Sequence, residues 1–302
     1  MALRIAYHPA YVHPVREGHR FPMLKYELIF LQLQYEGLVT SEAFFEPSLL
    51  DQDHIISTHD PKYVRQLFDL SLDAKMIRRI GFPLSEALVD RERYILDGTI
   101  RSSLYALQHG VSFNIAGGTH HAGYDFGEGF CLLNDQAVAA NYLLEQGHAR
   151  KILIIDLDVH QGNGTAHIFD GKAEVYTFSM HGDKNFPFIK ERSDRDVPLP
   201  DGIGDESYLQ LLAQELDSLF VEFTPDFVFY QAGVDILATD KLGKLKLSTA
   251  ACQQRDQFVL NRCYENQVPV QISMGGGYSE QIKDIVNAHV NTFRTAIDVF
   301  EF

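Results

Sequence analysis

The sequence predicts a single α/β domain, residues 1–302, built on a mainly parallel central sheet with helices on both faces. Two observations lead to this prediction. Short apolar runs alternate with longer segments of helical periodicity, a pattern typical of a parallel sheet covered on both sides. Each apolar run is also followed by polar or glycine-rich residues. In such sheets ligands bind beyond the carboxyl ends of the strands, so a functional site is expected there.

The first third of the chain is predicted to hold one strand and three helices. Leu3–Tyr7 is short and apolar, which favours a strand, and the polar, His-rich stretch 8–21 after it favours a loop. Proline suits the first turn of a helix, so helices are expected over 22–35 and from Pro61. In Leu84–His109 apolar residues recur about every 3.6 positions, which predicts one long helix.

The rest of the chain alternates regularly between apolar runs of strand length and helical segments, which completes the α/β pattern. The predicted strands are Val111–Ala116, Ile152–Leu157, Glu174–Met180, Asp226–Gln231 and Val268–Met274. The predicted helices lie near 133–146, 205–222, 249–266 and 279–297.

Composition limits the class of partner. Hydrophobic residues at 45% and charged residues at 22% are ordinary for a globular domain with a sizeable core. The net charge of -15 argues against a nucleic-acid backbone, whose binding rests on clustered Lys and Arg. An acidic surface is compatible with a cationic substrate, although solubility alone would also explain the charge.

The compartment is predicted from the cysteines and from the start of the chain. Cys131, Cys252 and Cys263 have no CxxC spacing and cannot all pair, which favours a reducing environment. The first residues lack a basic region followed by an apolar core, and no apolar run approaches the length of a membrane span. We therefore expect a cytoplasmic protein that is not held in a membrane.

A metal site is predicted from the stretch 151–164, KILIIDLDVHQGNG. Asp156, Asp158 and His160 occupy alternate positions, and alternate residues of a strand share one face. Buried unpaired charge is costly, and a divalent ion is the simplest partner. A third ligand would come from Asp235 or Asp240, between which spacing alone does not choose. The competing interpretation is a hydrogen-bonded pair at a strand end.

Two glycine-rich turns add groups suited to acid–base chemistry. His120 and His121 follow two glycines in GGTHHAG, and neighbouring charges would push their pKa values apart, giving one imidazolium and one base. Asp156 could instead orient one of these rings. In GGGY, Tyr278 could aim its hydroxyl at an oxyanion. Motifs of serine hydrolases, P-loop nucleotide hydrolases, HExxH metalloproteases and dinucleotide-binding enzymes are absent from the sequence.

The motifs GGTHHAG, DLDVHQGNG, AGVDILATDKLG and GGGY, in this order, resemble the zinc-dependent histone deacetylase superfamily, which includes acetylpolyamine amidohydrolases and acetoin-utilisation proteins. The resemblance runs from the first strand to the last helix and is closest to class IV and bacterial members. It implies an arginase/deacetylase-like fold and a Zn²⁺-dependent amidohydrolase. Its substrate would be an N-acyl-lysine or a related acylated amine such as an acetylpolyamine, with no direct contact to nucleic acid.

The resemblance also implies roles for individual residues. The implied zinc ligands are Asp158, His160 and Asp240. The implied catalytic groups are His121 as general base and acid, His120 as its electrostatic partner, Asp156 paired with His120, Asn163 beside the other histidine, and Tyr278 as the hydrogen-bond donor to the substrate carbonyl. The implied walls of the acyl-lysine tunnel are Gly129, Phe130 and Phe186. A structural K⁺ or Na⁺ would involve Asp156, Ser179 and Met180, and a second one Phe169, Val175 and Tyr208.

Two departures and two rival functions follow from the same motifs. Asn163 stands where many relatives have an aspartate, and an amide stabilises an imidazolium less, so the base should be less basic. The segment 79–86 lacks the rim aspartate of some relatives, which leaves protein-borne lysine and small acylated amines both open. An oxygen-rich ligand set would also accept Fe²⁺. The rivals are an arginase-like ureohydrolase, which needs two metals, and a non-catalytic acyl-lysine-binding module.

Overall fold

Parallel strands form the centre of the molecule in the computed structural model, which describes residues 3–302. The strands are β1 (Arg4–Ala6), β2 (Phe44–Phe45), β3 (Val111–Asn114), β4 (Ile152–Asp156), β5 (Val175–Gly182), β6 (Arg195–Leu199), β7 (Phe227–Gln231) and β8 (Val270–Ser273). They make one eight-stranded sheet in the order β2-β1-β3-β8-β7-β4-β5-β6. All the pairings between them are parallel, as the alternating sequence pattern predicts.

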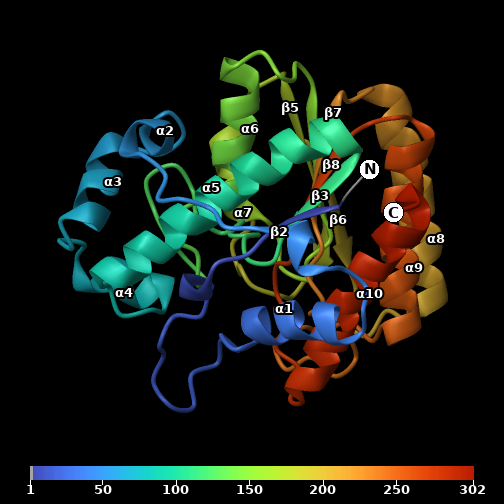
Figure 1. Ribbon diagram of the computed structural model, residues 1–302, viewed down its shortest axis with the longest axis horizontal. Helices are drawn as coiled ribbons and strands as arrows, with labels where there is room; N and C mark the ends of the chain where they lie inside the picture. The colour runs from blue at the N-terminus through green and yellow to red at the C-terminus, as the bar shows by residue number, and fades with distance from the viewer. Residues whose placement is uncertain (1–2) are drawn as a thin grey trace.

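Helices cover both faces of this sheet (Figure 1). They are α1 (Lys25–Tyr35), α2 (Gln52–Ile56), α3 (Pro61–Phe68), α4 (Ala74–Ile80), α5 (Glu86–His109), α6 (Asp135–Glu145), α7 (Asn163–Phe169), α8 (Asp205–Glu222), α9 (Thr249–Glu265) and α10 (Ile282–Phe300). On one side α8 packs on α9, α9 on α10 and α10 on α1. On the other side α5 packs on α6 and against β1 and β3. None of the described helices is long and apolar enough to cross a membrane.

The long helix α5 shows how local sequence sets the ends of an element. Its first residue follows Ser85, whose hydroxyl accepts a hydrogen bond from the Leu88 backbone N–H. This satisfies one of the unpaired N–H groups at the helix start. The helix ends at Gly110, whose positive φ of 91° is costly for other residues. One long helix was predicted here, and it is confirmed.

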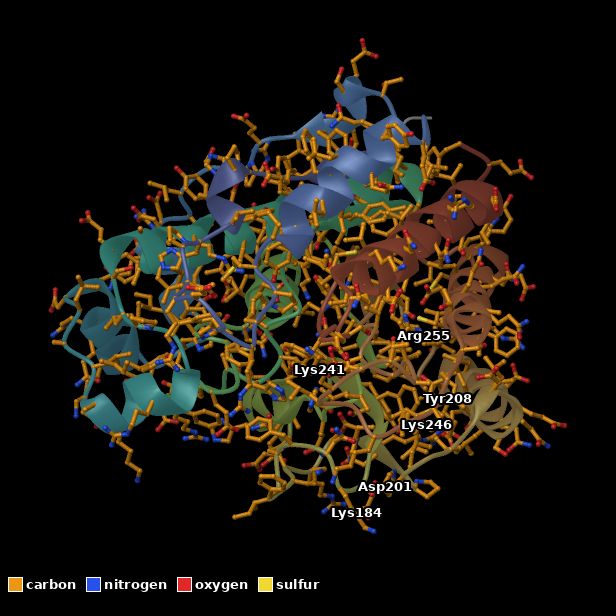
Figure 2. The ribbon with its side chains drawn as sticks, turned by 90° about the horizontal axis from the view of Figure 1, so that it is seen from below. Lys184, Asp201, Tyr208, Lys241, Lys246 and Arg255 are labelled. Carbon is orange, nitrogen blue, oxygen red and sulfur yellow. The ribbon has the colours of Figure 1, made fainter. Side chains whose placement is uncertain are left out.

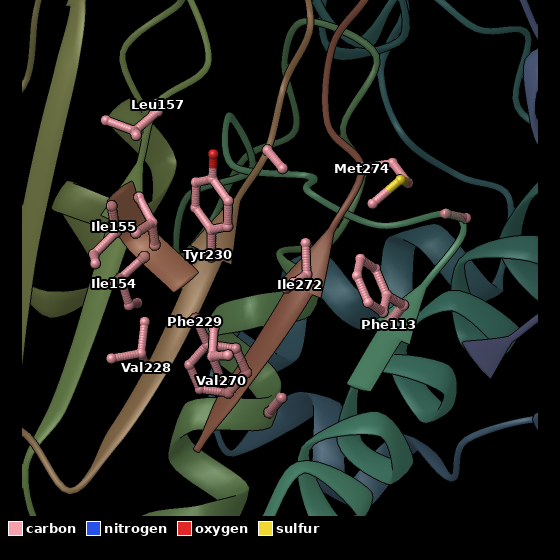
Figure 3. Close-up of a cluster of buried hydrophobic side chains, with 14 of the residues drawn as sticks. Phe113, Ile154, Ile155, Leu157, Val228, Phe229, Tyr230, Val270, Ile272 and Met274 are labelled. Carbon is pink, nitrogen blue, oxygen red and sulfur yellow. The ribbon is translucent and has the colours of Figure 1, made fainter. Parts of the chain in front are cut away.

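The core lies where the central strands meet the helices. Strand β7 has five consecutive buried residues, FVFYQ, and β4 has ILIID buried throughout. Figure 3 shows buried side chains from four strands that belong to one hydrophobic cluster, including Phe113, Ile154, Val228 and Ile272. Strands that are buried on both faces must be apolar at successive positions, which is why they were recognisable in the sequence.

The strand order places a crossover at the centre of the sheet. The chain leaves β3, passes to β4, continues outward to β5 and β6, and then returns to insert β7 and β8 between β3 and β4. The loops that follow the four central strands β3, β8, β7 and β4 therefore converge at one edge of the sheet. Open α/β sheets bind ligands at such a switch point.

One predicted arrangement is wrong. Strand β4 ends at Asp156, so Asp158 and His160 do not continue along the same strand face. The Asp156 carboxylate accepts the Asp158 N–H at 3.1 Å, and the Asp158 carboxylate accepts the His160 N–H at 3.0 Å. These side-chain bonds take up the N–H groups of Asp158 and His160 where the chain bends, although the Leu157 N–H still donates to the Gln231 carbonyl of β7. The two side chains are nevertheless brought together by this turn.

Candidate active site

A buried Asp–His–Asp cluster lies beyond the carboxyl ends of β4 and β7. Nδ1 of His160 is 3.0 Å from a carboxylate oxygen of Asp158 and 3.1 Å from one of Asp235. All three side chains are buried, and their ligand atoms lie within 4.8 Å of one another. A cluster of two carboxylates and an imidazole with this spacing could hold a divalent ion.

Asp240 lies near this cluster but is held differently. One of its oxygens accepts the N–H groups of Leu242 and Gly243, each at 2.8 Å, and the other accepts the Tyr278 N–H at 2.6 Å. The carboxylate is therefore fixed beside the tyrosine. Spacing left Asp235 and Asp240 open as the third ligand, and the family resemblance favoured Asp240. In the structure Asp235 is the one in contact with His160.

The electrostatics of the cluster fit a cation. Burial lowers the pKa of His160, but the bonds to Asp158 and Asp235 outweigh it and raise the pKa to about 10. Burial, together with the charge of Asp158, raises the pKa of Asp235 to about 7. Carboxylates that are buried this closely need a positive charge among them. A proton on His160 can supply it, and so can a metal ion, which is the better match for three converging ligand atoms.

The two adjacent histidines have different partners. Nδ1 of His120 is 2.7 Å from the Asp156 carboxylate, and Nδ1 of His121 is 2.7 Å from the Asn163 carbonyl oxygen. Burial opposes a charge on His120, but Asp156 and Asp158 raise its pKa to about 9. Burial lowers the pKa of His121 well below its usual value, and the charges of His120 and His160 lower it further. The ring centroids are only 4.1 Å apart, so the pair combines one imidazolium with one neutral base.

The orientation of the Asn163 amide fixes the tautomer of His121. The Asn163 NH₂ group donates to Glu128 at 2.9 Å, so its carbonyl oxygen faces the ring. Nδ1 of His121 must therefore carry the hydrogen, which leaves Nε2 free to accept a proton. Glu128 in turn forms an ion pair with Arg79. Glu128 could not be recognised from the sequence, because its contact with Asn163 joins residues far apart in the chain.

The loop that carries the histidines is held by Asp135, which sequence reasoning also missed. One oxygen of this buried carboxylate accepts the N–H groups of Gly118 and Thr119, each at 2.8 Å. The other accepts the hydroxyls of Thr99 and Ser273. A carboxylate with this many donors orders the backbone around it. The available signal was its place at the start of α6, one residue after the helix-capping Asn134.

Tyr278 is positioned by the glycine turn after β8. A Cβ on Gly276 would lie 2.0 Å from an Asp235 oxygen, so only glycine fits there. The buried Lys25 ammonium donates a hydrogen bond to the Gly275 carbonyl at 2.6 Å and so holds the turn in place. Burial lowers the pKa of Lys25 to about 8, although the charges of Asp235, Asp158 and Asp240 favour its charged form. Burial and the nearby Asp158 and Asp235 raise the pKa of Tyr278 well above 10.0, so its hydroxyl keeps its proton.

These groups open into one cavity of about 660 Å³. His121, His160 and Tyr278 lie on its lining, together with the predicted tunnel residues Gly129, Phe130 and Phe186. The Phe186 ring is 5.0 Å from the His121 ring, nearly perpendicular to it. Gly129 has a positive φ of 55°, and a Cβ there would approach His121 to 2.7 Å. The predicted wall residues therefore surround the neutral histidine.

The residues expected at monovalent-cation sites lie next to this centre or on neighbouring elements. Ser179 is the β5 partner of Asp156 in the sheet register, and its hydroxyl is 3.0 Å from Nδ1 of His181. Met180 follows on the same strand and is buried. The residues of the second expected site, Phe169, Val175 and Tyr208, are buried on α7, β5 and α8.

Sequence comparison identifies relatives over almost the whole chain. Residues 19–293 match the family described as the histone deacetylase domain. An uncharacterized protein of Picosynechococcus sp. is 44% identical over 300 residues, which is 99% of this chain and 100% of that protein. Histone deacetylase 2 of Arabidopsis thaliana is 27% identical, covering 90% of this chain and 73% of its own. A probable deacetylase of Archaeoglobus fulgidus is 31% identical, covering 72% and 64%.

Solved structures share the fold. An HDAC homologue from Aquifex aeolicus superimposes with a TM-score of 0.84 at 22% sequence identity, covering 100% of this chain and 89% of its own. An HDAC homologue complexed with SAHA gives a TM-score of 0.83 at the same identity and coverage. At this identity the likeness concerns architecture. Together with the match over residues 19–293, it establishes that this chain belongs to the histone deacetylase family.

Proposed function

We propose that this protein is a metal-dependent amidohydrolase that removes an acetyl or other acyl group from an N-acyl-lysine. The observation that carries the proposal is the composition of one cavity. A buried carboxylate–imidazole cluster, a neutral histidine and a protonated tyrosine hydroxyl meet at its floor. A metal, a base and an oxyanion donor are what hydrolysis of an unactivated amide requires.

In this proposal Asp158, His160 and Asp235, whose ligand atoms converge, would hold Zn²⁺, with Fe²⁺ as an alternative that the oxygen-rich ligand set also suits. Asp240, the third ligand that the family resemblance implied, would instead hold the turn at Tyr278, because both of its oxygens accept backbone N–H groups. A divalent ion held in the Asp–His–Asp cluster would supply Lewis-acid chemistry, which would polarise the amide carbonyl and make water a better nucleophile near neutral pH. A structural K⁺ or Na⁺ would be held around Asp156, Ser179 and Met180.

His121 would move the protons of the reaction. Its neutral Nε2 takes a proton from the attacking water and returns it to the nitrogen of the departing amine. The low pKa of His121 keeps it neutral and ready to accept this proton at pH 7. His120 stays protonated against Asp156 and adds fixed positive charge beside the developing oxyanion.

Tyr278 would donate its hydroxyl hydrogen to the carbonyl oxygen as negative charge develops there. Phe130 and Phe186, with Gly129 between His121 and Phe186, would enclose the aliphatic part of the acylated side chain. A reducing compartment such as the cytoplasm suits the three free, buried cysteines.

The test is a panel of acyl substrates with the purified protein. Acetyl-lysine peptides, longer acyl-lysine peptides and acetylspermidine are incubated with enzyme that carries Zn²⁺ or Fe²⁺, and the release of acid and amine is measured. We expect amide hydrolysis that a chelator abolishes and added metal restores. Full activity after complete metal removal would rule the proposal out, and peptide binding without any product would indicate a binding module.

A further inference from the structure

The mouth of the cavity is strongly cationic although the protein as a whole is acidic. The chain has 26 Lys and Arg against 41 Asp and Glu. The cavity lining within residues 3–302 contains no aspartate or glutamate, whereas it contains six basic side chains. They are Arg16, Arg20, Arg78, Arg79, Lys184 and Lys244. Such a reversal of sign at one opening creates a local field opposite to that of the remaining surface.

Most of these cations are available to a ligand. Arg79 is paired with Glu128. The other five have no carboxylate within ion-pair distance among the described residues. They come from separate segments: the loop before α1, helix α4, and the loops after β5 and β7. Lys184 lies at the lower edge of the view in Figure 2, and the Lys244 ammonium donates to its carbonyl at 2.9 Å. All five are exposed.

The position of the exposed cations indicates which part of the substrate carries negative charge. The acyl group must reach His121 and Tyr278 at the floor, past the rings of Phe130 and Phe186. The exposed cations lie outside those rings, on the side of the amine-bearing part of the substrate. An acetylpolyamine would present its own ammonium groups to this cationic opening, which is unfavourable.

An apolar tip beside the mouth favours a peptide over a small anionic amine. Phe188 and Ile189 are 85% and 88% exposed, and Phe188 lines the cavity. Their loop is held by Lys190, whose ammonium donates to the carbonyls of Asp183, Asn185 and Pro187. Exposed aromatic and aliphatic residues on a fixed loop are typical of sites that bind another macromolecule.

From the cationic mouth and its apolar tip we infer that the substrate is an acyl-lysine in a peptide segment with aspartate or glutamate close to the acylated residue. This inference rests on the proposed amidohydrolase function and narrows its substrate class. The exposed cations attract the flanking carboxylates before the acyl chain enters, which raises the rate of productive encounter and lowers KM.

The experiment compares three peptides that share one central acetyl-lysine and differ only in flanking residues. The flanks are Asp/Glu, Asn/Gln or Lys/Arg, and acetylspermidine is a fourth substrate. At about 0.05 M NaCl we expect kcat/KM to be about tenfold higher for the acidic than for the neutral peptide, mainly through KM. The difference should shrink at about 0.5 M NaCl, where exposed charges are screened.

Two double charge-reversal variants test whether the cations of the mouth cause the preference for the acidic peptide. Arg78→Glu with Lys184→Glu should abolish the preference for the acidic peptide. The matched control is Lys62→Glu with Arg65→Glu on α3, which changes the net charge equally but lies outside the cavity lining. The control should retain the wild-type ratio of acidic to neutral kcat/KM. A control that loses this ratio equally would show that overall charge, not the mouth, sets the preference.

The outcomes separate this inference from the proposed function. Equal kcat/KM for all three peptides, or a preference for the basic peptide or acetylspermidine, overturns the inference and leaves amide hydrolysis intact. If no substrate is hydrolysed, the proposed function fails. The Kd values of the three peptides for Tyr278→Phe, measured by fluorescence anisotropy, then test the inference without turnover. Acidic-peptide affinity that is no higher than neutral-peptide affinity overturns it.

Discussion

The floor and the mouth of the cavity carry opposite charge in opposite environments. Next to the floor residues His121, His160 and Tyr278, but not in the lining itself, Asp156, Asp158 and Asp235 are buried, and Asp240 is held by three backbone N–H groups. At the mouth, the cations are exposed. Removing one partner from a buried pair costs about 3–5 kcal/mol, whereas five of the six mouth cations have no ion-pair partner among the described residues to lose. Changes at the floor should therefore affect the chemical step, and changes at the mouth should affect substrate selection.

The largest expected effect is at the metal ligands. Asp158→Asn keeps the shape of the side chain but removes the charge, so bound metal and turnover should both be lost. Asp235→Asn should behave in the same way. Asp240→Asn should retain metal, measured by elemental analysis, because Asp240 is proposed to hold the turn at Tyr278. If Asp240→Asn loses the metal and Asp235→Asn retains it, the ligand assignment must be exchanged between the two.

The next effect is at the oxyanion donor. Tyr278→Phe removes one hydroxyl that is proposed to act in the transition state. The loss of such a donor costs roughly 2.7–4 kcal/mol, so kcat should fall by about a hundredfold or more. KM and metal content should change little, since the ring remains in place. A kcat close to that of the wild type would exclude Tyr278 as the donor.

A smaller effect, on pH dependence, is expected at Asn163. In Asn163→Asp a carboxylate replaces the amide beside Nδ1 of His121 and stabilises the imidazolium, so the pKa of His121 rises. Since the base acts when neutral, the acidic limb of the kcat/KM profile should move to higher pH.

The new carboxylate would also face Glu128, which accepts from the Asn163 amide in the wild type. The combination Asn163→Asp with Glu128→Gln removes that repulsion and serves as the control. An acidic limb that stays in place in both variants would show that a group other than His121 limits the rate. The charge-reversal variants at the mouth, with an effect of about tenfold on kcat/KM, complete the series.

The sheet was predictable where its strands are buried on both faces, as in β4 and β7, because burial demands continuous apolar sequence. The edge strand β6 was missed. Its residues RDVPL are mostly only half-buried, and Pro198 is tolerated because the strand lies at the end of the sheet order. Its pattern is therefore not that of a buried strand.

The candidate site was partly predictable for a similar reason. The pairing of His120 with Asp156 and of His121 with Asn163 joins residues whose motifs stand out locally. The residues that hold these loops in place were not recognisable in the sequence. Asp135 and Lys25 act through contacts with backbone groups in distant segments, which only the folded chain brings together. The contact of Asp235 with His160 likewise depended on the fold.

The amide of Asn163 limits the routes by which His121 can transfer a proton. Nδ1 of His121 already donates its hydrogen to the amide oxygen, and an amide does not ionise at ordinary pH. A carboxylate in that place could share the proton, whereas the amide blocks the path from the ring toward Glu128 and Arg79 at the surface. Any proton that His121 gains at Nε2 must leave from Nε2. The imidazole of His121 therefore exchanges protons only at Nε2, on the side of the substrate cavity.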